Sequence, residues 1–114
     1  MELQHETLGD NIQIIKLTGK LDIAGVDQIE TQFAEYCSGD KARVIVDLSG
    51  VDYLASVGIR MLTINAKSVA YRGGQMVLVR PTAEVKHVLE LTGLPAIVPM
   101  YSGLESAEAV LMAA

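Results

Sequence analysis

The sequence predicts an α/β fold: a mixed, mainly parallel sheet of about five strands with about four helices packed against it. Continuous apolar runs at residues 44–46 and 76–79 are typical of strands buried on both faces of a parallel sheet. Between such runs lie segments with apolar residues at intervals of three and four, which is the spacing of amphipathic helices. Strands that alternate with helices imply right-handed crossovers between parallel neighbours.

The length and composition narrow the class of protein. At 114 residues, we expect one domain covering residues 1–114. The formal net charge of −5 disfavours nucleic acid and anionic membranes as partners, because both attract clustered basic residues. The single cysteine, Cys37, permits no internal disulfide and is expected to be a small buried side chain. No apolar run reaches the length of a membrane span and no signal-peptide pattern is present, so we expect a cytoplasmic location.

The first part of the chain is predicted to form a hairpin followed by a helix. Residues 2–7 and 12–18 have strand character, and Gly9-Asp10-Asn11 supplies turn residues between them. Asp22 is the expected N-cap of the first helix, which Ser38-Gly39-Asp40 ends. The inner face of this helix carries apolar residues at helical spacing: Val26, Ile29, Phe33 and Cys37.

The middle of the chain is predicted to contain a buried strand and then a loop with an acidic edge. The strand covers residues 44–48, and Ser49 and Gly50 are expected to end it. Asp47 and Asp52 are interpreted as solvated carboxylates of this loop. The segment therefore predicts a short interior strand with charged groups at its carboxyl end.

A second helix is predicted from about residue 56 to residue 71, with Ile59, Leu62, Ala66 and Val69 on its inner face. Ser56 lies at or beside its N-cap, where a hydroxyl can accept a backbone hydrogen bond. A phosphate at this position would also meet the positive end of the helix dipole. Gly73-Gly74 is expected to stop the helix in a left-handed conformation.

The last third of the chain is predicted to contribute two more strands and two more helices. After the strand at 76–79, Pro81-Thr82 opens a helix that Gly93 and Pro95 close. Residues 96–100 are predicted to form a short final strand. Ser102-Gly-Leu-Glu105 matches a capping box and is expected to open the last helix.

The sequence offers little for catalysis or metal binding. It has no glycine-rich nucleotide motif, and His5 and His87 are isolated and expected at the surface. Ser56-Val57-Gly58 after a strand is similar to half of a nucleophile elbow, although Leu54 occupies the position of its first glycine. Glu84 followed by His87 is the only acid and histidine order available to it. A small serine hydrolase therefore remains an alternative, and comparing ester hydrolysis by the wild type and Ser56→Ala would test it. Apart from this alternative, we expect the protein to be no enzyme and to bind no metal or cofactor.

Four segments, taken in order, resemble the STAS domain family, and more narrowly its free-standing anti-sigma factor antagonists. They are Leu17-Thr-Gly-Lys-Leu-Asp22, Val46-Asp-Leu-Ser-Gly-Val-Asp-Tyr-Leu-Ala-Ser-Val-Gly-Ile-Arg60, Gly73-Gly-Gln-Met-Val-Leu-Val79 and Val85-Lys-His-Val-Leu-Glu-Leu-Thr-Gly-Leu94. The resemblance covers nearly the whole chain and implies a mixed sheet with packed helices. It also implies partner switching, in which the unphosphorylated form binds an anti-sigma factor that is a serine protein kinase. Phosphorylation then releases the protein, and a PP2C-type phosphatase resets it.

Carried over residue by residue, the resemblance makes Ser56 the phosphorylated residue and matches Gly58 to the glycine of the family motif. Independently of the resemblance, Gly58 is expected to allow close packing of the helix start. Ala55 and Val57 replace the acidic residue and the second hydroxyl residue that are usual there. The partner-binding surface that the resemblance implies consists of Asp22, Asp52, Tyr53, Ala55, Ser56, Val57, Gly58 and Ile59. The alternative within the family is a STAS scaffold or transport-complex subunit without a phosphorylation switch.

Overall fold

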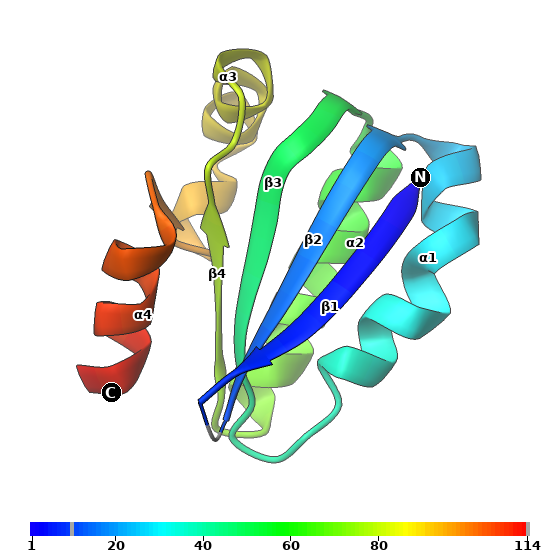
Figure 1. Ribbon diagram of the computed structural model, residues 1–114. Coiled ribbons are helices and arrows are strands. Elements are labelled where there is room, and N and C mark those ends of the chain that lie inside the picture. The colour runs from blue at the N-terminus through cyan, green and yellow to red at the C-terminus, as the bar shows by residue number, and fades with distance from the viewer. Residues whose placement is uncertain (10, 114) are drawn as a thin grey trace.

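A five-stranded sheet forms the centre of the protein, whose computed structural model describes residues 1–9 and 11–113. The strands are β1 (Glu2–Leu8), β2 (Ile12–Leu21), β3 (Arg43–Leu54), β4 (Gln75–Val79) and β5 (Met100–Tyr101). They lie side by side in chain order, with β1 antiparallel to β2 and each later pair parallel. The predicted mixed, mainly parallel sheet is therefore confirmed (Figure 1).

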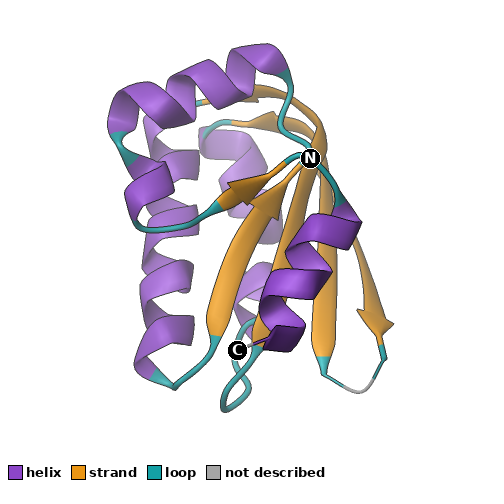
Figure 2. Ribbon diagram, turned by 90° about the vertical axis from the view of Figure 1, so that its left-hand side faces the viewer, coloured by secondary structure: helices purple, strands orange, loops and turns teal. Residues whose placement is uncertain are grey.

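The helices lie on both faces of this sheet. They are α1 (Ile23–Tyr36), α2 (Ser56–Tyr71), α3 (Ala83–Thr92) and α4 (Leu104–Ala113), with a short 3-10 helix at Leu94–Ala96. The parallel strands β2 to β5 lie across the sheet in chain order, so each connection moves toward the same edge. Right-handed crossovers therefore place α1, α2 and α3 on the same face. The last helix, α4, packs on the opposite face over β3, β4 and β5 (Figures 1 and 2).

Two groups of buried side chains fill the space between these layers. Alternate residues of each strand point to opposite faces, so Val44 and Val46 join the larger group beneath α1, α2 and α3. Ile45 belongs to the smaller group beneath α4, together with Ala107 and Leu111 of that helix. Strands covered on both faces explain why the sequence shows continuous apolar runs rather than strict alternation.

The third strand is longer than predicted. It continues through Ser49, Gly50 and Asp52 to Leu54, where the sequence analysis expected a loop. The reason is non-local, because β2 also extends to Leu21 and the two strands pair along this extension with two register shifts. A Cβ atom on Gly50 would lie 2.9 Å from the carbonyl oxygen of Leu17. Close pairing with β2 therefore outweighs the low strand propensity of this segment.

The carboxyl-terminal region differs from its prediction in two places. The strand expected at 96–100 is mostly irregular, and only Met100–Tyr101 pairs with β4. Proline explains this difference, because Pro95 lies in the first turn of the 3-10 helix and Pro99 has no N–H to donate. The predicted capping box is also wrong, since α4 begins at Leu104 and Gly103, not Ser102, precedes it.

Other local predictions can be compared with the structure directly. Gly93 ends α3 in a left-handed conformation, with φ of 76°, as the sequence predicted. His87 is exposed, but His5 is half-buried and stacks on Tyr36 with ring centroids 3.7 Å apart, so its expected surface position is only partly right. The predicted turn at 9–11 includes Asp10, which lies outside the described residues. Within residues 1–9 and 11–113, no helix is long and apolar enough to cross a membrane.

Candidate functional site

The starts of two helices lie next to each other at one end of the sheet. Strands β2 and β3 are parallel, and their last residues, Leu21 and Leu54, are paired in register. The backbone N–H of Ala55 donates to the carbonyl oxygen of Leu21 over 3.1 Å, which ties the start of α2 to the end of β2. Since α1 begins two residues after Leu21, both helix N-termini open at the same edge (Figure 1). Ligands of parallel α/β sheets commonly bind at this edge.

Ser56 is the first residue of α2, and its side chain is exposed. The N-cap position belongs to Ala55, which has extended backbone angles and makes no side-chain capping bond. Of the two positions that the sequence predicted for Ser56, at the N-cap or beside it, the structure shows the second. The first backbone N–H groups of a helix have no acceptor within that helix, and the helix dipole adds positive potential there. The position of Ser56 is thus electrostatically suited to carry a negative group.

Asp22 is the N-cap of α1, as the sequence predicted. Its carboxylate accepts a hydrogen bond of 2.8 Å from the backbone N–H of Gly25. The turn beneath it is tight, because a Cβ atom on Gly25 would lie 2.0 Å from the carbonyl oxygen of Lys20. Asp22 is therefore held half-buried at the edge where α2 also begins.

Gly58 allows the first turn of α2 to pack directly on the end of β2. It is buried, and a Cβ atom at this position would lie 2.7 Å from both the carbonyl oxygen and Cγ of Leu21. Real Cβ contacts with backbone are essentially never that short. The interpretation of Gly58 as a close-packing residue is confirmed, and this packing fixes the position of Ser56 relative to the sheet.

The rim beside Ser56 carries an aromatic residue and two opposite charges. Tyr53 and Asp52 are exposed on β3, and Asp52 lies in the strand rather than in the predicted loop. The Nζ atom of Lys20 lies 3.9 Å from Asp52 Oδ1 and 5.9 Å from the ring centroid of Tyr53. Both charged side chains are about two-thirds exposed, so this pair contributes little to stability. Lys20 belongs to the segment at residues 17–22 that carries the resemblance, and the pairing of β2 with β3 brings it opposite Tyr53 at this rim.

The remaining predicted surface residues, Val57 and Ile59, are half-buried and pack in part against the larger core. They can offer a partner only the exposed part of their side chains. For the alternative of a serine hydrolase, a histidine would have to lie within hydrogen-bonding reach of Ser56. In the described part of the chain, no hydrogen bond joins Ser56 to Glu84 or His87, and no cluster of three metal-binding side chains occurs.

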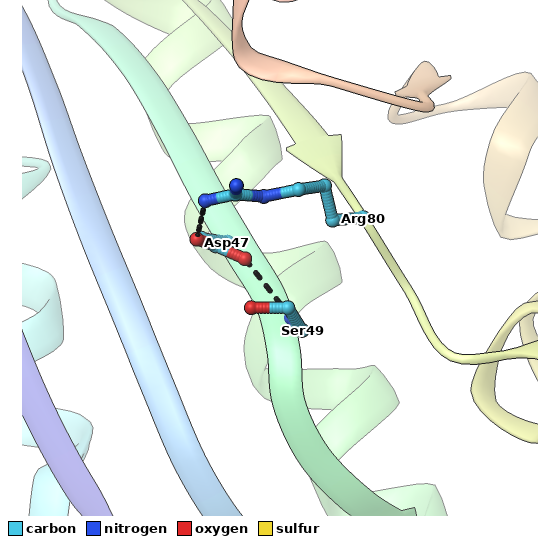
Figure 3. Close-up of polar contacts among 3 residues, drawn as sticks. All are labelled: Asp47, Ser49 and Arg80. Atoms are coloured by element: carbon cyan, nitrogen blue, oxygen red, sulfur yellow. Dashed lines mark hydrogen bonds and ion pairs between the residues drawn. The ribbon is translucent and has the colours of Figure 1, made fainter.

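Asp47 does not belong to this site, and its interpretation as a solvated loop carboxylate is wrong. It is 2% exposed within β3, on the face that α4 covers. Its carboxylate accepts hydrogen bonds from the guanidinium of Arg80 and, over 2.9 Å, from the backbone N–H of Ser49 (Figure 3). Burial alone would raise the pKa of the Asp47 carboxyl, but the bonds from Ser49 and Arg80 outweigh it and hold the pKa below its ordinary value.

Fold and site together define a small α/β domain that presents a serine at the start of a helix, beside the capped start of a second helix. The chain belongs to the STAS domain family, whose model matches residues 6–107. This match confirms the family and the fold that the sequence motifs indicated.

Individual relatives agree with this assignment. BtrV of Bordetella bronchiseptica, which is described as a candidate anti-sigma factor antagonist, is 30% identical over 105 residues, covering 92% of this chain and 90% of that protein. A solved structure from Thermotoga maritima with the same description has a TM-score of 0.88 at 24% identity, covering 96% of this chain and 94% of that one. The Bacillus anti-sigma factor antagonist SpoIIAA, in its unphosphorylated form, has a TM-score of 0.76 at 23% identity, covering 96% and 93%.

Proposed function

We propose that this protein is an anti-sigma factor antagonist that works by partner switching and is itself no enzyme. In this proposal the unphosphorylated form binds an anti-sigma factor that is also a serine protein kinase. Phosphorylation of Ser56 releases that kinase, and a PP2C-type phosphatase restores the binding form. The observation that carries the proposal is the exposed Ser56 at the first position of α2, in a chain whose relatives are described as anti-sigma factor antagonists.

The physical basis of the switch is that a phosphate at Ser56 affects the partner more than the fold. Phosphorylation adds a charge of about −1.5 to −2 at neutral pH. The N-terminus of α2 favours a negative group, and the Ser56 side chain is exposed, so the fold has no reason to change. A partner that has closed over this surface must instead accommodate a bulky, strongly hydrated dianion. A loss of roughly 3 kcal/mol would weaken binding about a hundredfold, which is enough to exchange one partner for another.

The proposal is tested by titrating the purified kinase with variants of Ser56. We expect Ser56→Ala to bind like the unmodified protein and Ser56→Asp to bind at least about thirtyfold more weakly. Ser106→Asp is a matched control, because Ser106 is also exposed and lies in the first turn of α4, on the opposite face of the sheet. Equal affinity of the wild type and Ser56→Asp would refute the proposal.

A further inference from the structure

A long groove lies between α1 and α2 and leads away from Ser56. It consists of two adjoining hollows of about 580 and 650 Å³, which share Glu30, Met61 and Ile64 in their walls. On the α2 side, Val57, Met61, Ile64 and Ser68 line the groove at intervals of four, three and four residues. One side of α2 is therefore open to the groove over about three helical turns.

The lips of the groove carry exposed aliphatic side chains. Ile23, at the start of α1, is 75% exposed, and Ile64, in the middle of α2, is 51% exposed. Neither side chain completes the core, so the fold gains little from an apolar residue at either position. Val57 and Met61 lie between them in the wall of the groove. Exposed apolar side chains that the core does not use, as at Ile23 and Ile64, are a common feature of docking surfaces.

The α1 side of the groove is acidic. Asp27, Glu30 and Glu35 line it, and among the described residues Arg60 is the only basic one in either hollow. Across residues 1–9 and 11–113, the ion pairs are Lys20 with Asp52 and Arg80 with Asp47. None of the three carboxylates on the groove therefore has a cationic partner within the described structure. Their charges are available to an approaching basic group.

We propose that this groove receives a helix of the binding partner that carries an apolar stripe flanked by lysine or arginine. The inference rests on the proposed function, because it identifies a second part of the partner surface. Apolar residues on one face of a helix recur at the same three- and four-residue spacing as the residues that line α2. The basic flank of the partner would lie against α1, whose carboxylates attract it.

Two further observations favour a partner helix over a second copy of this chain. Two copies meeting groove to groove would bring their acidic α1 rims together, and like charges across an interface are costly. Val57 also lines the groove and directly follows Ser56. A phosphate on Ser56 would therefore lie at the end of the groove, where it could weaken the binding of a helix seated along it.

The groove can be tested with a designed peptide of about four helical turns, having leucines at helical spacing and lysines on one flank. In an NMR titration of the ¹⁵N-labelled protein, we expect the amide signals of Ala34, Asn65 and Ser68, at the far end of the groove, to shift. Ile64→Ser should lower the affinity for the peptide about tenfold, whereas Leu91→Ser, which removes an exposed leucine of α3, should leave that affinity unchanged. Glu30→Lys should lower the affinity for the peptide by a similar factor. Glu90→Lys is the matched control and should leave the affinity unchanged.

Three outcomes would overturn the inference. They are unchanged signals of the groove residues up to about 1 mM peptide, unaltered binding by Ile64→Ser, and equal binding of a peptide whose lysines are replaced by glutamate. A fourth outcome comes from sedimentation of the wild type and Ile64→Ser. If the wild type is a dimer and Ile64→Ser is a monomer, the groove binds a second copy of the chain instead of a partner helix.

The same variants separate this inference from the proposed function. If Ser56→Asp abolishes kinase binding while Ile64→Ser and Glu30→Lys bind the kinase like the wild type, the groove inference fails and the proposed function stands. If the peptide occupies the groove with the expected pattern while Ser56→Asp binds the kinase normally, the switch at Ser56 fails instead.

Discussion

The buried ion pair between Asp47 and Arg80 predicts a stability that depends on pH. In Asp47→Asn the side chain keeps its shape and an oxygen that can accept from the N–H of Ser49, but it loses the charge that faces Arg80. Hydrogen bonds to charged groups contribute roughly 1.5–3 kcal/mol. The Arg80 side chain is 43% exposed, so water replaces part of this interaction and the lower end of the range applies. We expect Asp47→Asn to lower the free energy of unfolding by about 1.5 kcal/mol at pH 7.

The pH dependence of this difference is the sharper test. The pKa of Asp47 is lowered in the folded protein, whereas in the unfolded chain the pKa returns to about 3.9. The stabilisation is therefore complete above about pH 4 and is lost as the pH falls through the lower, folded-state pKa. Urea unfolding of the wild type and Asp47→Asn should show the full difference at pH 7 and a shrinking one below pH 4. Asp40→Asn, at an exposed position, controls for net charge. A difference that is absent at pH 7, or the same at pH 7 and pH 2.5, would refute this reasoning.

Two further variants test the packing around the helix starts, and an alkylating reagent tests the burial of Cys37 at the end of α1. Gly58→Ala should destabilise the protein by about 2 kcal/mol in urea unfolding, because the added methyl group meets Leu21. Gly39→Ala is the control, because nothing lies within 4 Å of its added Cβ, and it should not destabilise the protein. Equal effects of the two variants would contradict the close packing at Gly58. Asp22→Ala should cost about 1 kcal/mol through loss of the α1 cap, and an unchanged unfolding midpoint would argue against that role. Burial raises the pKa of the Cys37 thiol to about 12 despite the nearby Arg72, so an alkylating reagent at pH 8 should modify the folded protein far more slowly than the urea-unfolded chain.

Local patterns in the sequence predicted the parts of this protein that depend on neighbouring residues. Helical periodicity located the inner face of α2, and the cap at Asp22 followed from residue type and position alone. The close-packing role of Gly58 was also inferred, because a glycine inside a helix usually has a packing reason. Each of these depends on the chemistry of a short segment.

The features that the sequence did not predict depend on residues that are distant in the chain. The segment from Ser49 onward continues β3 only because the end of β2 pairs along it, beginning with Thr18 opposite Gly50. Asp47 looked solvated because its partner, Arg80, lies 33 positions further along the chain. The groove between α1 and α2 likewise exists only after two helices have packed together. Ile64 lies outside the predicted inner face of α2, but the sequence alone does not show which element it faces.

The central claim is that phosphorylation of Ser56 controls binding, and the mass of the protein from its native cells tests it most directly. Intact-mass analysis with peptide mapping across residues 54–60 should reveal a fraction that carries one phosphate, located on Ser56. A Ser56→Ala variant expressed in the same cells should lack that fraction. A pool that is entirely unmodified across growth and stress conditions would contradict the claim, and it would favour a STAS module that binds constitutively.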